Sequence, residues 1–200
     1  MTVTRGRGRP KSADAGVLAI QALRVLDARG YRECTMADVA AEAGISIRTL
    51  HRYFPAKADI VWGPVDISFQ SLRQRLDETP VGMPLARALR EGIIASFSDH
   101  PEDKSTTRLR MRLIGRTPEL RANSSEPFRR WRQSIVDFVA ERTGSDPLDL
   151  LPTVAGSAVQ VTTMSALVWW ATNIEAGDPD VAVAEALDAL GAGFSAAFAR

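Results

Sequence analysis

The sequence predicts an all-α protein in which a three-helix head at the N-terminus is followed by a larger helical body. Apolar residues recur every three or four positions through most of the chain, as they do on one face of an α-helix. Proline, glycine, asparagine and serine cluster between these segments, where they favour turns and helix caps. No segment shows the apolar–polar alternation of a strand between hairpin turns, so no sheet is expected.

The expected elements follow from this periodicity, taken in chain order. A basic flexible arm over residues 1–13 precedes a helix-turn-helix domain over 14–55 and a helical domain over 56–200. Pro64 follows Gly63 inside the fourth expected helix, so we expect a kink or break there that links the head to the body. The helices are expected over residues 14–30, 36–43, 47–54, 56–77, 84–98, 102–115, 126–143, 148–176 and 179–199.

The composition is that of an ordinary soluble globular protein, since 45% of its 200 residues are hydrophobic and 24% are charged. Cys34 is the one cysteine, which excludes an intramolecular disulfide and multi-cysteine metal sites. A single cysteine is also typical of a reducing compartment. The N-terminus lacks the apolar stretch of a signal peptide, and we find no run of about 18 apolar residues. We therefore expect a cytoplasmic protein with no membrane partner.

Charge is distributed unevenly along the chain. Residues 1–57 carry ten lysines and arginines against five acidic residues, whereas residues 58–200 carry fifteen against nineteen. A basic head on an acidic body favours a polyanionic partner, although chance asymmetry would look the same. In the arm, Arg5, Arg7, Arg9 and Lys11 are expected to contact DNA phosphates or a minor groove; an ordinary solvated tail is the alternative.

Residues 35–54 have the layout of a helix-turn-helix. Thr35 is expected to cap the first of its two helices and Ser46 the second, with a left-handed turn at Gly44 between them. Leu50 and Phe54 lie four residues apart and are expected to face the core, which leaves the other side of the second helix for a major groove. By spacing alone, a compact helical hairpin with a polar face fits as well.

The DNA contacts are assigned from the chemistry of the side chains. Arginine can bind guanine through two hydrogen bonds, and a threonine methyl can pack on a thymine methyl. Hydroxyl and ammonium groups near helix ends suit phosphates. The expected DNA-binding residues of the helix-turn-helix are Thr35, Ser46, Arg48, Thr49, His51, Arg52, Tyr53 and Lys57.

These residues resemble the DNA-binding domain of the TetR (tetracycline-repressor) family. The resemblance runs from Leu18 to Ile60 and implies three N-terminal helices for DNA, with six or so beyond them for ligand binding and dimerisation. It also implies phosphate contacts for Thr35, Tyr53 and Lys57, with base or phosphate contacts for Arg48, Thr49, His51 and Arg52. His51 departs from the family pattern, which more often has an aromatic residue there. The pattern that carries the resemblance is Thr35, Asp38-Val39-Ala40, Ala43-Gly44-Ile45-Ser46, Thr49-Leu50, Tyr53-Phe54-Pro55, Lys57 and Asp59-Ile60.

A shorter stretch resembles the mycofactocin-system branch of the same family. It runs from Tyr53 to Gly63 and continues from Pro84 to Leu89. Regulators of that branch are associated with long-chain acyl-coenzyme A ligands. The resemblance therefore implies an effector of that kind.

The last two expected helices favour a homodimer. They are rich in small residues over 155–158 and 182–197, which permit close helix approach, and Leu187, Leu190, Phe194 and Phe198 form an apolar stripe. In the TetR-like interpretation these helices pair across a two-fold axis, which lets two recognition helices read successive major grooves. Ordinary internal packing is the alternative.

The expected effector site lies in the body. Ligand pockets are mostly apolar with few polar anchors, and each apolar candidate, taken singly, is also compatible with plain core packing. Arginines on one face of the helix over 102–115 favour an anionic ligand, such as the phosphates of coenzyme A, with a solvated face as the alternative. The expected ligand-binding residues are Arg108, Met111, Arg112, Trp131, Phe138, Met164 and Trp169.

The sequence shows no catalytic or metal-binding constellation. His51 and His100 lie in different segments, and we find no phosphate-binding loop, nucleophile elbow or cluster with metal-ligand spacing. We therefore expect neither an enzyme nor a cofactor, but a repressor that binds a palindromic operator as a homodimer and is released by a small molecule. An activator fits the same residues as a repressor. The alternative of another class is a small-molecule carrier or interaction protein with a vestigial helix-turn-helix, which would lack salt-dependent DNA binding.

Overall fold

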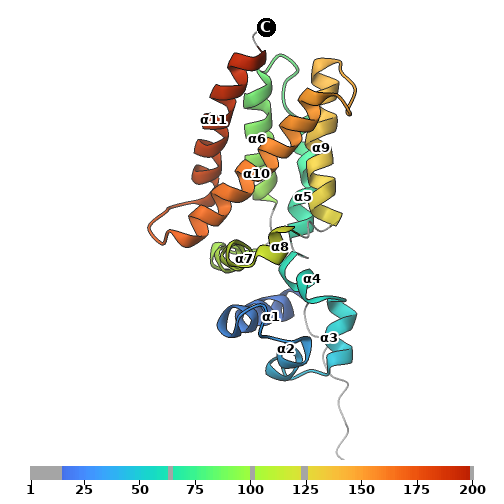
Figure 1. Ribbon diagram of the computed structural model, residues 1–200, viewed down its shortest axis with the longest axis vertical. Coiled ribbons are helices and arrows are strands. Elements are labelled where there is room, and N and C mark those ends of the chain that lie inside the picture. Colours follow the sequence, from blue (N-terminus) through green and yellow to red (C-terminus); the bar gives the residue numbers. More distant parts are fainter. Residues whose placement is uncertain (1–14, 63–64, 100–101, 123–125, 199–200) are drawn as a thin grey trace, which may run out of the picture. The chain divides into compact units, whose positions relative to one another are not determined.

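The computed structural model of the chain describes residues 15–62, 65–99, 102–122 and 126–198. Within these ranges all regular structure is helical, which confirms the all-α prediction (Figure 1). The chain divides between Ile60 and Val61 into two compact units, called here the head and the body. The basic arm, with Arg5, Arg7, Arg9 and Lys11, lies outside the described residues, so its role stays a prediction.

The head contains three helices and the start of a fourth (Figure 1). In α1 (Ala15–Arg29) the buried side chains recur every three or four residues, so one face of the helix closes over the core of the head. The helix ends before Gly30, whose φ of 87° lies in the left-handed region that favours glycine. The remaining helices of the head are α2 (Met36–Glu42), α3 (Ile47–Tyr53) and the first residues of α4 (Lys57–Trp62).

The expected helix over 56–77 is divided in the structure. It becomes α4, which ends at Trp62, and α5 (Val65–Asp77), with Gly63 and Pro64 outside the described residues. Proline has no amide hydrogen to donate, and its ring disfavours a helical conformation in the residue before it. The boundary between head and body falls inside the short α4.

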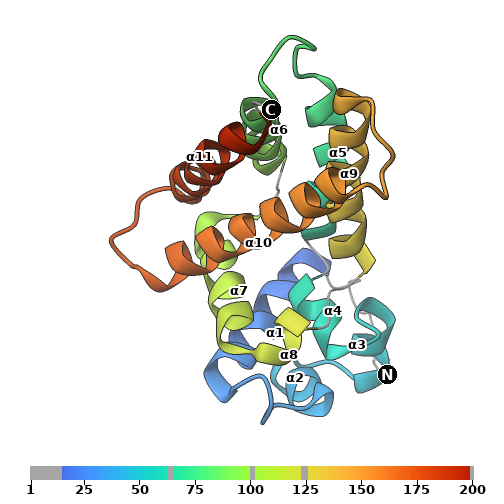
Figure 2. The same cartoon turned by 45° about the horizontal axis from the view of Figure 1, so that its top comes forward.

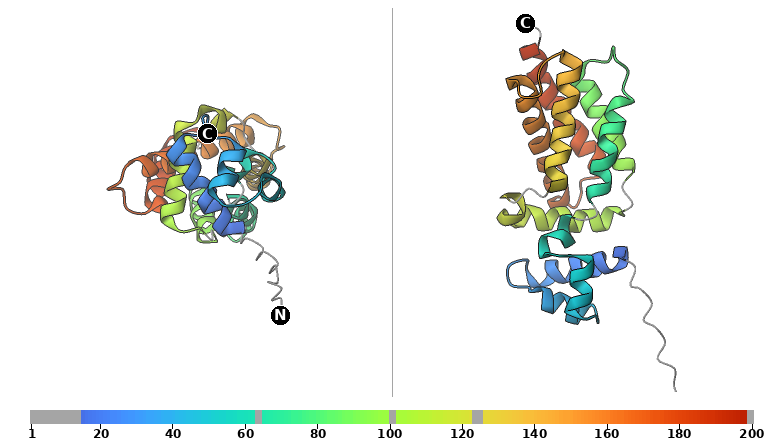
Figure 3. Two further views of the ribbon diagram at one scale, coloured as in Figure 1. Left: turned by 90° about the horizontal axis from the view of Figure 1, so that it is seen from below. Right: turned by 90° about the vertical axis from the view of Figure 1, so that its right-hand side faces the viewer.

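The body is a helical bundle whose longest helix in the described residues is α10. This helix packs against α9 on one side, α11 on the other, and α7 towards one end, as Figures 2 and 3 show. Gly115 lets α7 and α10 approach closely, because a Cβ atom there would lie 2.5 Å from Cγ1 of Val168. The helices of the body after α5 are α6 (Leu85–Ser98), α7 (Lys104–Arg116), α8 (Pro118–Ala122), α9 (Glu126–Thr143), α10 (Leu150–Thr172) and α11 (Pro179–Phe198).

Apart from the divided helix, three helices differ from the expectation by more than one residue. Helix α10 spans Leu150–Thr172 where 148–176 was expected. The short α8 was not expected; it starts at Pro118, a residue suited to the first position of a helix. α7 begins at Lys104 rather than at Glu102, because Asp103 acts as its N-cap. The Asp103 carboxylate accepts hydrogen bonds from the backbone amides of Ser105 at 2.9 Å and Thr106 at 3.0 Å.

The Asp103 cap makes the stability of the body depend on pH. Hydrogen bonds from Ser105 and Thr106 lower the pKa of Asp103 to about 2, below that of an unfolded aspartate. A lowered pKa stabilises the fold above the unfolded value, and this stabilisation is lost as the pH falls through about 2. At pH 6, Asp103→Ala should therefore cost about 0.5–2 kcal/mol in urea unfolding, and the difference from the parent should shrink below pH 4.

Asp149 offers the matched control for this test. It is the N-cap of α10 but makes no side-chain hydrogen bond to that helix. Asp149→Ala should cost less than Asp103→Ala at pH 6. Equal losses would contradict the assignment of the Asp103 bonds as a stabilising cap.

Helix α10 is long and apolar enough to cross a membrane by length and composition, although no such segment was expected from the sequence. Of its most apolar window, 44% is buried inside the fold. A core helix of a soluble protein can have the same length and composition, so these two properties do not by themselves indicate a membrane span. Val159, Thr163 and Trp170 are among its buried side chains.

Candidate DNA-binding surface and effector cavities

The helix-turn-helix is built from local signals in the sequence. Thr35 and Asp38 form a reciprocal capping box at the start of α2, where the threonine amide donates to the carboxylate at 2.8 Å. Gly44 makes the turn with a φ of 65°. Ser46 then caps α3, since its hydroxyl accepts from the amide of Thr49 at 3.1 Å.

One side of α3 anchors the helix and the other is exposed. Leu50 and Phe54 are buried in the core of the head, as expected from their spacing. Ile47, three residues before Leu50, is 46% exposed and does not complete that stripe. Arg48, His51 and Arg52 are also exposed. The exposed surface of α3 therefore includes an apolar side chain, Ile47, at its N-terminal end.

His51 is held in one orientation. Its Nδ1–H donates to the carbonyl of Pro55 at 3.1 Å, since a carbonyl oxygen can only accept. This leaves Nε2 for an external partner, as an acceptor in the neutral ring and a donor in the protonated ring. Arg52 is also engaged locally, with its guanidinium 5.0 Å from the centre of the Tyr53 ring.

Three of the expected DNA-binding residues also make hydrogen bonds inside the head. The Lys57 ammonium donates to the carbonyls of Tyr31 and of Cys34, the latter at 2.8 Å, and lies 4.4 Å from the centre of the Tyr31 ring. The Thr35 hydroxyl donates to Asp38, and that of Ser46 lies 2.8 Å from the Thr49 hydroxyl. Lys57 thus ties α4 to the segment before α2, and its contact with DNA stays a prediction.

Arg48 is expected to contact a base. Arg48→Ala should lose about 1–3 kcal/mol of discrimination between operator and random DNA, because a bidentate contact to guanine carries sequence information. The measurement is fluorescence anisotropy on both duplexes at one salt concentration. Arg24→Ala, at an exposed position of α1, removes the same charge and should not change the ratio of the two affinities. Equal weakening on both duplexes by Arg48→Ala would assign Arg48 to a phosphate instead.

The body contains two adjoining cavities. The first, of about 230 Å³, is lined by apolar side chains of α6, α7, α9 and α10, by three acidic residues and by Lys104. The second, of about 430 Å³, is lined by side chains of α4, α7, α8, α9 and α10. Phe128 and Met164 contribute to the walls of both. Together the cavities suit an apolar ligand with a few polar anchors.

Four of the expected ligand-binding residues line these cavities. Met111 and Trp131 line the first, Trp169 lines the second, and Met164 lines both. Arg108, Arg112 and Phe138 are absent from both walls.

Arg108 binds backbone carbonyls at the C-terminal end of α10 and does not line either cavity. Its guanidinium donates to the carbonyls of Trp170 at 2.9 Å, Asn173 at 2.8 Å and Ala176 at 3.1 Å. It also lies 4.2 Å from the centre of the Trp170 ring. A cation at a helix C-terminus binds carbonyls that have no partner in the helix and opposes the negative end of its dipole.

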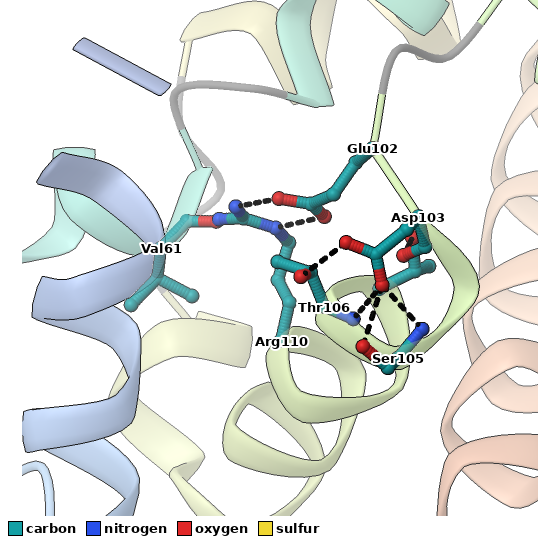
Figure 4. A network of polar contacts seen from close by, with 7 residues as sticks. Val61, Glu102, Asp103, Ser105, Thr106 and Arg110 are labelled. Carbon is teal, nitrogen blue, oxygen red and sulfur yellow. Dashed lines mark hydrogen bonds and ion pairs between the residues drawn. The ribbon is translucent and has the colours of Figure 1, made fainter. Parts of the chain in front are cut away.

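The arginine-rich segment also contains a buried ion pair (Figure 4). Arg110 is fully buried, and its guanidinium donates to both carboxylate oxygens of Glu102, at 2.6 and 3.0 Å. Its remaining nitrogen, Nη1, donates to the carbonyl of Val61 in the last turn of α4. Sequence reasoning missed this site, because nothing in the local pattern distinguishes Arg110 from the other arginines nearby.

The two cavities differ in charge. Glu102, Asp178 and Asp180 line the first, where Lys104 pairs with Asp178. Burial, followed by the neighbouring Asp178 carboxylate, raises the pKa of Asp180. In the second, Arg121 is the charged residue among the described side chains of the wall. A negatively charged group is therefore better accommodated in the second cavity than in the first.

No group of three or more histidine, cysteine, aspartate and glutamate side chains is placed to hold a metal ion in the described part of the chain.

Comparison with known proteins agrees with this architecture. Residues 21–61 match the family model for bacterial regulatory proteins of the tetR family, and residues 83–195 match that for the MftR C-terminal domain. The chain is 32% identical over 186 residues to the mycofactocin biosynthesis transcriptional regulator MftR of Mycobacterium tuberculosis, covering 93% of both chains. It is 29% identical over 155 residues to the HTH-type transcriptional regulator EthR of Mycolicibacterium smegmatis, covering 74% of this chain and 71% of EthR.

Solved structures share the fold. The TetR-family regulator PfmR of Thermus thermophilus superimposes with a TM-score of 0.50 at 15% identity, over 86% of this chain and 94% of its own. A tetR-family regulator of Streptomyces coelicolor gives a TM-score of 0.52 at 16% identity, over 92% and 85%. At these identities the likeness extends to the fold alone.

Proposed function

Because this chain belongs to the TetR family of transcriptional regulators, with an MftR-type C-terminal domain, we propose that it is a cytoplasmic repressor that binds a palindromic operator as a homodimer. A small apolar or anionic effector releases it, and long-chain acyl-coenzyme A is the first candidate, because residues 53–63 and 84–89 resemble the mycofactocin-system branch. The observation that carries the proposal is the exposed polar side of α3, opposite Leu50 and Phe54 in the core.

The proposed dimer interface lies on α10 and α11. Large apolar side chains of α10 are exposed at spacings of four, seven and eight residues, and Val181 of α11 is exposed as well. Exposed apolar side chains on one helix favour burial against a second copy. The small residues Ala155 and Gly156 are not part of this face, because they are buried, and a Cβ at Gly156 would lie 2.5 Å from Val136 of α9. The exposed apolar residues of α10 on the proposed face are Leu150, Val154, Val161 and Trp169.

The dimer is tested by placing charge on the proposed face. The double variant Val154→Asp and Val161→Asp should sediment as a monomer and lose operator affinity, because a buried unpaired carboxylate is strongly unfavourable and each monomer reads one half-site. Val81→Asp, at an exposed position between α5 and α6, is the matched control and should leave the dimer intact. A double variant that still sediments as a dimer would place the interface elsewhere.

Regulation is tested by fluorescence anisotropy of the full chain on duplexes from upstream of its own gene and from a genomic library. We expect tight binding that weakens steeply with salt, and release on addition of palmitoyl-coenzyme A. If the protein binds DNA but palmitoyl-coenzyme A does not change that binding, the proposal of a transcriptional regulator stands and palmitoyl-coenzyme A is excluded as its effector. Failure to bind any duplex in a salt-dependent manner would favour a small-molecule carrier with a vestigial helix-turn-helix.

A further inference from the structure

The indole of Trp62 lines the second cavity with an unused hydrogen-bond donor. Trp62 is the last residue of α4 and is 3% exposed, and its Nε1 has no hydrogen-bond partner among the residues that the structure describes. An indole N–H can only donate. A buried donor without an acceptor is unfavourable, so the cavity presents an unfilled position for an acceptor atom beside Trp62.

We propose that the second cavity binds the effector through an acceptor oxygen at Nε1 of Trp62, and that its apolar chain passes Phe128 and Met164 into the first cavity. This inference rests on the proposed function, which it extends by assigning the ligand's orientation and its contact with α4. The shared chemistry is an apolar chain with a carbonyl or carboxylate oxygen at one end. That oxygen belongs either to a free carboxylate or to a thioester.

The charges of the two walls set the orientation. Arg121 lines the second cavity, whereas three carboxylates line the first. Two of those carboxylates have cationic partners, namely Glu102 with Arg110 and Asp178 with Lys104. The remaining acidic character of the first cavity disfavours an oxygen-rich end group and leaves its apolar part for the chain.

The partition between the cavities is apolar and adaptable. Phe128 lies 5.4 Å from the Trp62 ring and 6.4 Å from the Trp131 ring, between centroids, so three aromatic rings extend from one cavity to the other. Met164 faces both cavities, and its unbranched side chain can change rotamer at low cost. Gln160 fixes the backbone beside the partition, because its side-chain amide donates to the carbonyl of Phe128 at 2.8 Å.

The far end of this path has a polar position as well. Thr163 of α10 lines the first cavity at 2% exposure, and within the described part of the chain its hydroxyl has no hydrogen-bond partner. A chain that carries a hydroxyl or keto group some distance from its end would satisfy Thr163. Trp62 therefore favours ligands with an acceptor oxygen in the end group, and Thr163 favours chains that carry a polar substituent.

Binding at Trp62 acts directly on α4. The preceding residue, Val61, has its carbonyl held by the buried Arg110. A ligand oxygen on Trp62 therefore acts on the same turn that the Arg110–Glu102 pair fixes. A ligand that prefers one position of this turn shifts the equilibrium between the positions by its difference in affinity.

The first experiment uses isothermal titration calorimetry of the full chain with dodecanoate, dodecanoyl-coenzyme A and dodecylamine, whose chains are alike. We expect at least one of the two oxygen-bearing probes to bind, with dodecylamine at least 100-fold weaker because an ammonium group has no acceptor. Binding of dodecanoate alone assigns a free carboxylate, and binding of dodecanoyl-coenzyme A alone assigns a thioester. The proposal is overturned if neither binds, or if dodecylamine binds equally well.

Two variants locate the contact. Trp62→Phe keeps an aromatic ring but removes the N–H, and should raise the Kd of the bound probe about tenfold, equivalent to one hydrogen bond. Trp170→Phe removes an indole N–H that donates to the carbonyl of Gly177 at 2.9 Å; Trp170 lines neither cavity, so this variant should change the Kd less than twofold. Equal effects of the two variants would overturn the assignment.

A measurement on the unmodified chain tests the Trp62 contact without depending on the folding of a variant. The chain has four tryptophans, so ¹⁵N–¹H spectra give four indole signals. The Trp62 signal should show the largest downfield shift on addition of the bound probe, as expected for a new hydrogen bond, and an unmoved Trp62 signal would overturn the proposal. Operator binding without any probe separates the two proposals, because it survives if only the Trp62 contact is wrong.

Discussion

Replacing Arg110 by methionine should lower the free energy of unfolding of the body by about 3–5 kcal/mol, because it leaves Glu102 buried without its partner. The same change removes the donor to the Val61 carbonyl, which should loosen the last turn of α4. Urea unfolding of the full chain measures the first effect. Operator affinity and its response to effector measure the second.

The double variant Arg110→Met and Glu102→Leu is the control for this test. It removes both charges, and replacing a buried ion pair by apolar residues of similar volume is often neutral or stabilising. We expect the double variant to recover most of the lost stability but not the parental response to effector. If Arg110→Met costs less than about 1 kcal/mol, then Glu102 is better hydrated than its 6% side-chain exposure indicates.

Replacing Arg5, Arg7, Arg9 and Lys11 by glutamine should flatten the salt dependence of operator binding. A dimer carries two arms, so up to eight cations are lost, and the slope of log K against log salt should fall by about 7 at most. Contacts in this number change affinity roughly 10³–10⁵-fold between 50 and 200 mM salt. Anisotropy titrations across that range measure the slope, and substitution rather than deletion keeps the length of the chain.

The matched control removes the same number of charges from the body. Arg87, Arg116, Arg130 and Arg132 are exposed in the described structure, and replacing all four by glutamine should leave the slope unchanged. Similar flattening in both variants would mean that net charge, and not the arm, sets the salt dependence. An unchanged slope in the arm variant would make the arm a solvated tail.

Much of the head could be predicted from sequence because its signals are local. Caps at Thr35 and Ser46 and the left-handed turn at Gly44 depend on residues within a few positions of each other. The core positions of α3 follow from a spacing of four residues. The helices of the body could be predicted for the same reason, with errors mainly at their ends, where capping competes with periodicity.

The effector site could be predicted only in part, because its polar groups are defined by distant partners. Arg108, Arg110 and Arg112 lie within five residues, yet Arg108 binds the end of α10 and Arg110 is buried against Glu102 and Val61. No local sequence pattern shows which of these arginines is buried and which stays solvated. Trp62 was likewise not expected as a cavity residue, since its neighbours on the wall are far away in sequence.

Cys34 allows the two units to be observed separately. It is the chain's one thiol, it is buried in the head at 1% exposure, and burial, followed by the Asp38 carboxylate, raises its pKa. Both effects suppress the reactive thiolate, so an alkylating reagent should modify Cys34 at a rate set by transient opening of the head. All four tryptophans belong to the body, so their fluorescence follows that unit alone. One sample can thus yield a free energy of opening for the head, from Cys34 alkylation, and a free energy of unfolding for the body, from tryptophan fluorescence. The change in each value on addition of effector measures how strongly the ligand stabilises that unit.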